Sequence, residues 1–120
     1  MKKQMLAIAL STAVAASGMC TSAVFAEESE TYTVGICQLV QHDALDAATQ
    51  GFKDALTEKL GDAVTFDEQN AQGDTNTCST IINSFTSANV DLILENATPA
   101  LQAAVAGTNE IPILGTSVTE

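Results

Sequence analysis

The feature that most constrains this chain is a plan that repeats between residues 32 and 120: an apolar strand, a polar loop and a helix that starts directly after the loop. Apolar segments predict strands over residues 32–37, 64–66, 91–95 and 111–114. Strands that alternate with helices form right-handed βαβ units around a parallel sheet. We therefore predict an α/β fold of three layers, with a parallel sheet in the order 2-1-3-4 and helices on both faces.

Turn and cap residues mark where the helices begin and end. Apolar periodicity predicts helices over residues 43–60 and 75–88. Gly61 is typical of the end of a helix, and Asp74 or Thr75 is typical of an N-cap. A third helix is predicted to begin at Thr98-Pro99, with Thr98 as N-cap and Pro99 at the first helical position, where a missing N–H removes no hydrogen bond.

The first 26 residues have the layout of a secretory signal peptide. Two lysines precede an apolar run over residues 5–16, and small residues continue to Ala26, where we expect cleavage. Residues 27–31 read as a polar lead-in, so the folded domain is predicted to span residues 32–120. A lipoprotein signal ending at Cys20 is the less favoured alternative, because Ser17 and Met19 depart from its usual pattern. Export to the periplasm or the cell surface is the predicted location.

Charge and cysteine content exclude several kinds of partner. The chain has 15 acidic residues against four lysines, a net charge of −11, and it has no arginine. This charge opposes binding to nucleic acid or to an anionic membrane. Cys37 and Cys78 are predicted to be two separate thiols, one in a buried strand and one at the start of a helix. Their spacing with a single histidine matches no metal site, so we expect no metal and no cofactor.

Polar residues that follow the strands are the candidate ligand contacts. Loops after parallel strands gather along one edge of the sheet, where ligands bind, and each of these loops opens onto a helix N-terminus that favours anions. The candidates are Gln38, His42, Asp46, Asn70, Gln72, Thr98, Pro99, Thr116 and Ser117.

Each candidate also has a purely structural interpretation. His42 is typical of a surface residue near a helix start, and the helix dipole favours Asp46 in a first turn. Asn70 and Gln72 lie in a loop of turn-forming residues, so a turn role is as well supported as a binding role. No nucleophile elbow, phosphate-binding loop or dinucleotide fingerprint occurs, so the chain is not predicted to be an enzyme.

Four segments together resemble the substrate-binding proteins of ABC importers, within a family of periplasmic components that includes presumed tryptophan and tyrosine binders. The segments are GICQLVQHDALD at 35–46, QNAQGD at 69–74, ATPA at 97–100 and IPIL at 111–114. The resemblance extends over residues 32–120. It implies two α/β lobes of the type I periplasmic-binding-protein fold that close on a small solute, of which this chain supplies part of the first lobe.

The resemblance also implies a function. It points to a receptor that captures an amino acid, with an aromatic one among the candidates, and delivers it to an ABC permease, as a monomer when full length. In that role the Thr98 region would hold the ligand carboxylate, with Gln38, His42 and Asp46 near its ammonium group or side chain. The alternatives are an exported sensory domain of the same fold, a non-functional remnant and, less favoured, an exported α/β enzyme.

Overall fold

The structure is a computed structural model that describes residues 30–119, so the predicted signal peptide and Cys20 lie outside the described residues. Its elements in chain order are β1 (Tyr32–Gln38), α2 (Asp43–Leu60), the short 3₁₀ helix η1 (Gly61–Ala63), β2 (Val64–Asn70), α3 (Thr75–Ala88), β3 (Leu92–Asn96), α4 (Thr98–Gly107) and β4 (Ile113–Thr116). The predicted alternation of strands and helices is confirmed.

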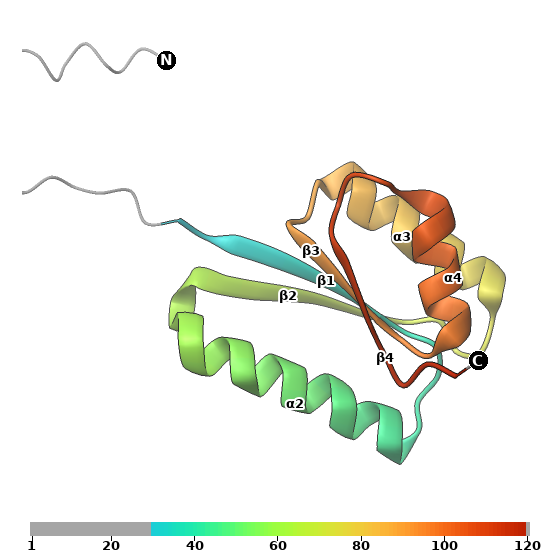
Figure 1. Cartoon of the computed structure of the whole chain (residues 1–120), viewed down its shortest axis with the longest axis horizontal. Coiled ribbons are helices and arrows are strands. Elements are labelled where there is room, and N and C mark those ends of the chain that lie inside the picture. Colours follow the sequence, from blue (N-terminus) through green and yellow to red (C-terminus); the bar gives the residue numbers. More distant parts are fainter. Residues whose placement is uncertain (1–29, 120) are drawn as a thin grey trace, which may run out of the picture.

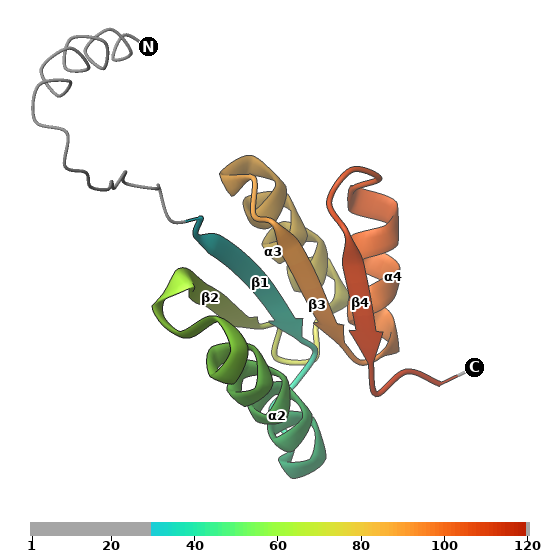
Figure 2. The ribbon, with the colours of Figure 1, turned by 60° about the vertical axis from the view of Figure 1, so that its left-hand side comes forward.

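The four strands form one parallel sheet in the order β2-β1-β3-β4, as predicted. Helix α2 covers one face, and α3 and α4 cover the other, which gives the three predicted layers (Figures 1 and 2). The chain leaves β1 for one face and β3 for the other, so the topological switch point lies between these two central strands. Ligands of open α/β sheets bind at the carboxyl ends of the strands beside such a point.

The core between the sheet and helices α3 and α4 is the larger of two. Ile82, Phe85 and Ile93 are fully buried there. Gly35 in the middle of β1 makes room for the Phe85 ring, because a Cβ atom at Gly35 would lie 2.7 Å from ring carbons. A side chain at this position would push the ring off the sheet, so the glycine sets how closely α3 approaches β1.

The core beneath α2 is smaller and more open. Val34, Ile36, Val64 and Leu94 are buried, while Phe52 and Leu56 of α2 are only partly buried against them. Ala55 and Leu60, which belong to the apolar periodicity that predicted this helix, are both exposed. Only one residue of α2 is buried, and it is polar: Thr49.

The strand boundaries differ from the prediction in a consistent way. Strand β2 continues to Asn70, four residues past its predicted end, because an edge strand that pairs only with β1 can expose polar side chains. Strands β1, β3 and β4 also end later than predicted, at Gln38, Asn96 and Thr116. Residues that the sequence placed in loops are therefore the last residues of strands, where the ladder fixes their positions.

Candidate functional site

The last residues of the four strands form one row across the carboxyl edge of the sheet, which we call the outer row: Asn70, Gln38, Asn96 and Thr116. Each is paired in register with its neighbour. Neighbouring residues in a parallel ladder point to the same face, so the outer row lies on the α2 side of the sheet. All four side chains are polar, and the two on the central strands are buried.

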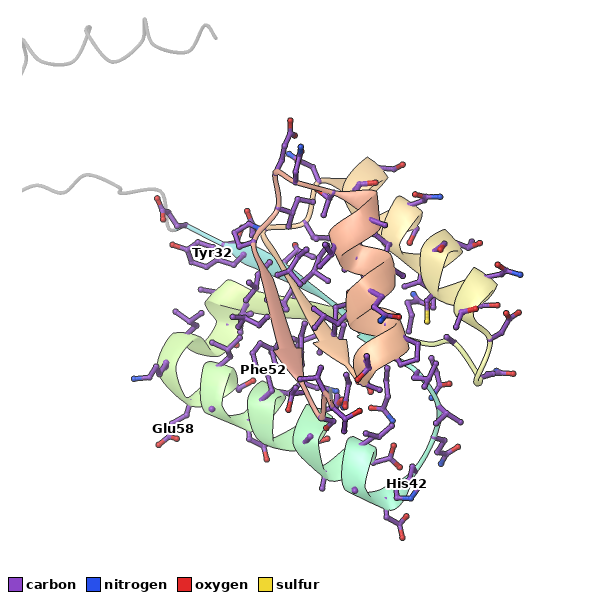
Figure 3. The ribbon with its side chains drawn as sticks, turned by 45° about the vertical axis from the view of Figure 1, so that its right-hand side comes forward. Tyr32, His42, Phe52 and Glu58 are labelled. Atoms are coloured by element: carbon purple, nitrogen blue, oxygen red, sulfur yellow. The ribbon has the colours of Figure 1, made fainter. Side chains whose placement is uncertain are left out.

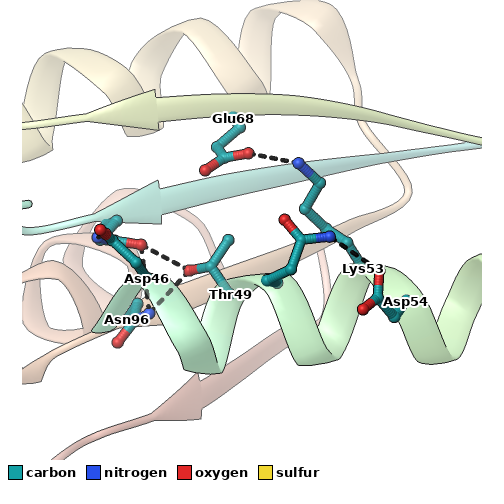
Figure 4. A network of polar contacts seen from close by, with 8 residues as sticks. Asp46, Thr49, Lys53, Asp54, Glu68 and Asn96 are labelled. Carbon is teal, nitrogen blue, oxygen red and sulfur yellow. Dashed lines mark hydrogen bonds and ion pairs between the residues drawn. The ribbon is translucent and has the colours of Figure 1, made fainter. Parts of the chain in front are cut away.

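Gln38 is held by bonds within the protein. Its side chain is 3% exposed; its Nε2 donates to Asp46 Oδ1 at 2.6 Å and to the Val40 carbonyl at 2.9 Å, and its Oε1 accepts from Thr49 Oγ1 at 2.7 Å. Figure 4 shows this network between β1, β3 and the first turns of α2. The structure thus brings the predicted residues Gln38 and Asp46 together. Gln38 is buried, whereas Asp46 is partly exposed.

His42 is the N-cap of α2, which begins at Asp43 as predicted. Its Nδ1 accepts a hydrogen bond from the Ala44 amide at 3.1 Å, and its backbone is extended, with φ −158°. An imidazole nitrogen that accepts in this way carries no proton, so the proton of the neutral ring sits on Nε2. The exposed ring lies at the end of α2 nearest the carboxyl edge of the sheet (Figure 3).

Asn70 and Gln72 form a tight turn after β2. The Asn70 Oδ1 accepts from the Gln72 amide at 2.7 Å, and Gln72 has a positive φ of 55°. This turn confirms the structural role that the sequence offered for Asn70. The two side chains also line an open hollow of about 330 Å³ together with Val40 and Gln41, so the turn presents amide groups to the same edge.

The prediction that Thr98 caps α4 is wrong. The N-cap is Ala97, which has no capping side chain and adopts φ 103° and ψ 154°, a region populated almost only by glycine. Thr98 is already helical, and its hydroxyl oxygen accepts from the Thr119 amide at 2.9 Å. Pro99 is consequently the second helical residue. The sharp turn at Ala97 comes one residue earlier than the sequence indicated, because β3 runs directly into α4.

The start of α4 has free backbone donors. The Ala97 amide donates to the Thr116 carbonyl and the Leu101 amide to the Ala97 carbonyl. Within residues 30–119, the amides of Thr98 and Ala100 have no such acceptor. First-turn amides of a helix are unpaired unless a cap or a ligand satisfies them, and the helix dipole adds positive potential. The end of β4 lies beside them, and Ser117 there turns the chain with a φ of 59°.

A second row, one residue earlier in each strand, faces α3 and α4: Gln69, Cys37, Glu95 and Gly115. We call it the inner row. Glu95 is 0% exposed, and neither of its carboxylate oxygens has a hydrogen-bond partner among the described residues. Burial raises the pKa of Glu95 to about 8, and the nearby Cys37 thiol opposes that shift only in part. At neutral pH this side chain is mostly protonated.

The two cysteines of the domain lie beside this buried acid. Cys37 and Cys78 are both buried and free, as predicted. Burial raises the pKa of each thiol, and the charge of Glu95 raises both further. Sequence reasoning placed Glu95 in a strand but did not single it out. The only signal was an acidic residue directly after three apolar ones in a strand that both faces bury.

A larger hollow of about 480 Å³ lies at the opposite, amino-terminal edge of the sheet. Its lining is mainly apolar, with Asp91 and the Tyr32 ring at the rim. Polar groups converge at the carboxyl edge, so we place the candidate site there. Across residues 30–119, no cluster of three or more histidine, cysteine or acidic side chains is arranged to hold a metal ion. None of the helices described is both long and apolar enough for a membrane span.

Comparison with known proteins identifies the family to which this fold belongs. The family described as "ABC transporter substrate binding protein" matches residues 33–120. A tyrosine-binding protein of Clostridioides difficile is 46% identical over 90 residues, which cover 72% of this chain and 26% of that protein. The chain thus spans about a quarter of the length of this curated relative.

Solved structures agree with the family match. The ligand-free, open form of a substrate-binding protein with adhesive properties from Clostridium difficile superposes with a TM-score of 0.72 at 43% identity, covering 75% of this chain and 32% of that one. An ABC domain in complex with L-Trp from Streptococcus pneumonia gives 0.71 at 30% identity, with 76% and 32% covered. These relatives are substrate-binding proteins and not enzymes, in agreement with the prediction. The chain belongs to the ABC transporter substrate-binding protein family.

Proposed function

We propose that this chain is part of an extracytoplasmic solute receptor of an ABC importer, and that its ligand is an amino acid, with aromatic amino acids favoured. The observation that carries the proposal is the outer row of polar residues beside the unpaired amides of α4, at the switch point of the sheet. Relatives described as a tyrosine-binding protein and as a complex with L-Trp support the ligand class. Because the chain spans only part of these relatives, the activity is proposed for the longer receptor.

The ligand carboxylate is assigned to the start of α4. The amides of Thr98 and Ala100 lie at a helix N-terminus and have no acceptor within residues 30–119, which favours an anion there. Pro99 between them has no N–H and fixes the first turn. Thr116 and Ser117 flank the same point from β4 and offer hydroxyl groups.

The ammonium group is assigned to the α2 side of the switch point. Asp46 is the acidic candidate there, and Gln38 holds its carboxylate. His42 presents its ring from the start of α2. Asn70 and Gln72 present amide groups from the end of the edge strand β2. These side chains hydrogen-bond well without adding charge, which suits a polar part of the ligand side chain such as a phenol or an indole N–H.

Residues 32–120 are proposed to form part of the first of two lobes that close on the ligand. Tyr32 lies at the strand end away from the site, and Phe52 packs under α2 (Figure 3), so neither ring is placed to stack on a ligand. An aromatic platform would come from the second lobe. The full-length receptor is proposed to be exported through the leader at residues 1–26 and to deliver its ligand to a membrane permease.

A thermal-shift and calorimetry screen of the full-length receptor, with the 120-residue chain run beside it, tests this proposal. L-tyrosine, L-tryptophan and L-phenylalanine are compared with the other amino acids, nucleosides and sugars. We expect a saturable rise in Tm with the aromatic amino acids, since ligand at a hundredfold its Kd stabilises a protein by about 2.7 kcal/mol. L-tyrosinamide, which lacks the carboxylate, should bind more weakly than L-tyrosine. A shift with a sugar or nucleoside alone, or no shift with any amino acid, would contradict the proposal.

A further inference from the structure

Three buried side chains form a chain of hydrogen bonds that ends on Asp46. Asn96 Nδ2 donates to Thr49 Oγ1 at 2.8 Å, Thr49 Oγ1 donates to Gln38 Oε1 at 2.7 Å, and Gln38 Nε2 donates to Asp46 Oδ1 at 2.6 Å. We propose that Thr49 and Asn96 are positioning residues that hold the Asp46 carboxylate ready for a primary ammonium group of the ligand. This inference rests on the proposed function, and neither residue was a candidate from the sequence.

The donors in this chain can run in one direction only. Asn96 Nδ2 also donates to the Leu45 carbonyl at 2.8 Å, and a carbonyl only accepts, so the amide nitrogen of Asn96 must face α2. Thr49 therefore accepts from Asn96 and has its single proton left for Gln38. The oxygen of the Gln38 amide is thereby turned toward Thr49, and its nitrogen is turned toward Asp46. The Val40 carbonyl, which accepts from Gln38 Nε2 at 2.9 Å, favours the same orientation, so β3 and the loop after β1 together present the amide nitrogen to the carboxylate.

The arrangement leaves one oxygen of Asp46 open. Gln38 holds Oδ1, while Oδ2 has no hydrogen-bond partner among the described residues, and the side chain is partly exposed. Lys53 is engaged with Glu68 at 2.7 Å, so no ion pair to Asp46 forms within residues 30–119. Asp46 is not needed as a helix cap either, because His42 takes that role. A carboxylate with one fixed and one open oxygen is suited to a donor of positive charge.

Holding this geometry leaves a polar atom of Asn96 unpaired. Its Oδ1 is buried and accepts no hydrogen bond within residues 30–119. A buried acceptor without a partner is destabilising, so the contacts of Asn96 are not optimal for stability alone. Local departures of this kind are expected at functional sites. Ala97, the next residue in the chain, also has an unfavourable local feature, its positive φ.

The test compares Thr49→Val, which keeps the shape and removes the hydroxyl, with Thr49→Ser, which keeps the hydroxyl. Binding of L-tyrosine and of its deaminated analogue 3-(4-hydroxyphenyl)propanoate is measured by calorimetry on the full-length receptor. We expect Thr49→Val to weaken L-tyrosine about tenfold, because Gln38 would lose the partner that orients it and its hydrogen bond to the charged Asp46 carboxylate would weaken. The deaminated analogue should change less than about twofold, and Thr49→Ser should restore most of the affinity. Thr80→Val, on the exposed face of α3, is the matched control and should change neither.

A double-mutant cycle separates this inference from the proposed function. In an Asp46→Asn background, Thr49→Val should weaken L-tyrosine by less than about twofold, because its effect acts through the carboxylate. Equal losses for L-tyrosine and for the deaminated analogue would overturn the positioning role and leave the proposed function standing. If the wild-type full-length receptor binds no amino acid, both fail together. Circular dichroism of each variant checks that the fold is retained.

Discussion

The inner and outer rows cross the same sheet one residue apart, and they bury polar groups in opposite ways. In the outer row, Gln38 and Asn96 are buried within a chain of hydrogen bonds that reaches α2. In the inner row, Glu95 is equally buried but lies between thiols and apolar side chains, and neither of its oxygens has a hydrogen-bond partner within residues 30–119. The first row keeps its polar groups oriented, and the second keeps its acid protonated.

The difference follows from what each face offers. The α2 face has Thr49 and the carbonyl of Leu45 within reach, so amide side chains find partners there. The α3 and α4 face offers mainly apolar atoms and the weakly bonding thiols of Cys37 and Cys78. Burying a polar group costs least when the group is hydrogen-bonded, and an unpaired acid costs less to bury when it is protonated than when it is charged. The site therefore draws its polar contacts from the α2 face.

Gln38→Leu should break the outer row most severely. It removes a hydrogen-bond partner of the buried Thr49 and Asn96 and of the partly exposed Asp46, and a buried polar group left without its partner typically costs about 1–3 kcal/mol. We expect the free energy of unfolding to fall by about 3 kcal/mol, measured by urea denaturation. The control is Gln69→Leu in the inner row, where the side chain is exposed and bonds only Asp67. A similar loss in both variants would contradict the network.

Glu95→Gln should change how stability depends on pH. The folded pKa of Glu95, about 8, lies above its ordinary value of 4.5, so between these values the folded chain retains a proton that the unfolded chain has released. The contribution of Glu95 to the free energy of unfolding is therefore full below pH 4.5. It falls as pH rises toward 8, by at most about 1.4 kcal/mol per pH unit.

Removing the ionisable group should remove this contribution. The difference between wild type and Glu95→Gln, followed by urea denaturation from pH 4 to pH 9, should therefore grow in favour of the variant as pH rises. Glu58→Gln on the exposed outer side of α2 is the control (Figure 3) and should give no such trend. A difference that stays constant with pH would show that Glu95 is ionised in the folded chain.

Ala97→Gly tests the strained backbone of the residue that connects β3 to α4. Its φ of 103° favours glycine, so the substitution should relieve backbone strain and stabilise the chain by about 1 kcal/mol. The same change at Ala106, an exposed helical residue of α4, should destabilise by about 0.5–1 kcal/mol. Thermal unfolding of both variants measures the two effects. Equal signs at the two positions would contradict the strained geometry at Ala97.

Lys53→Gln should have the smallest effect, because it removes an exposed polar contact rather than a buried one. Lys53 pairs with Glu68 at 2.7 Å at the outside of β2, where water screens the charges. We expect a loss of about 0.5 kcal/mol or less in dilute buffer, and less in high salt. A loss as large as that of Gln38→Leu would mean that exposed and buried polar contacts contribute alike.

Much of the fold could be predicted from the sequence because it depends on local patterns of apolar, turn and cap residues. The alternation of strands and helices led to the sheet order, and Gly61 and Asp74 marked the helix ends where the structure has them. The end of β2 was missed because residues 67–69 are polar, and only the position of the strand at the sheet edge makes that tolerable.

The site was less predictable because its contacts join distant segments. Gln38 and Asp46 were identified as polar residues near a helix start, but their bond depends on Thr49 and on Asn96, which lies 58 residues after Gln38. Nothing local marks Thr49 as the buried residue of α2. The cap at Thr98 was predicted from composition, and the unusual backbone of Ala97 overrode it.

The strand order has a consequence for assembly of the chain during synthesis. Strand β1 is made first and lies at the centre, so β2 and α2 can join it once residue 70 has emerged. At that length Gln38 already has Thr49 and Asp46 within reach. Asn96 joins them only after a loop of 47 residues from Thr49 is closed, at an entropic cost that grows slowly with length. Asn96, which acts on the carboxylate only through Thr49 and Gln38, thus arrives last, and the hydrogen-bond network of the site is completed after the first strands and helix have assembled.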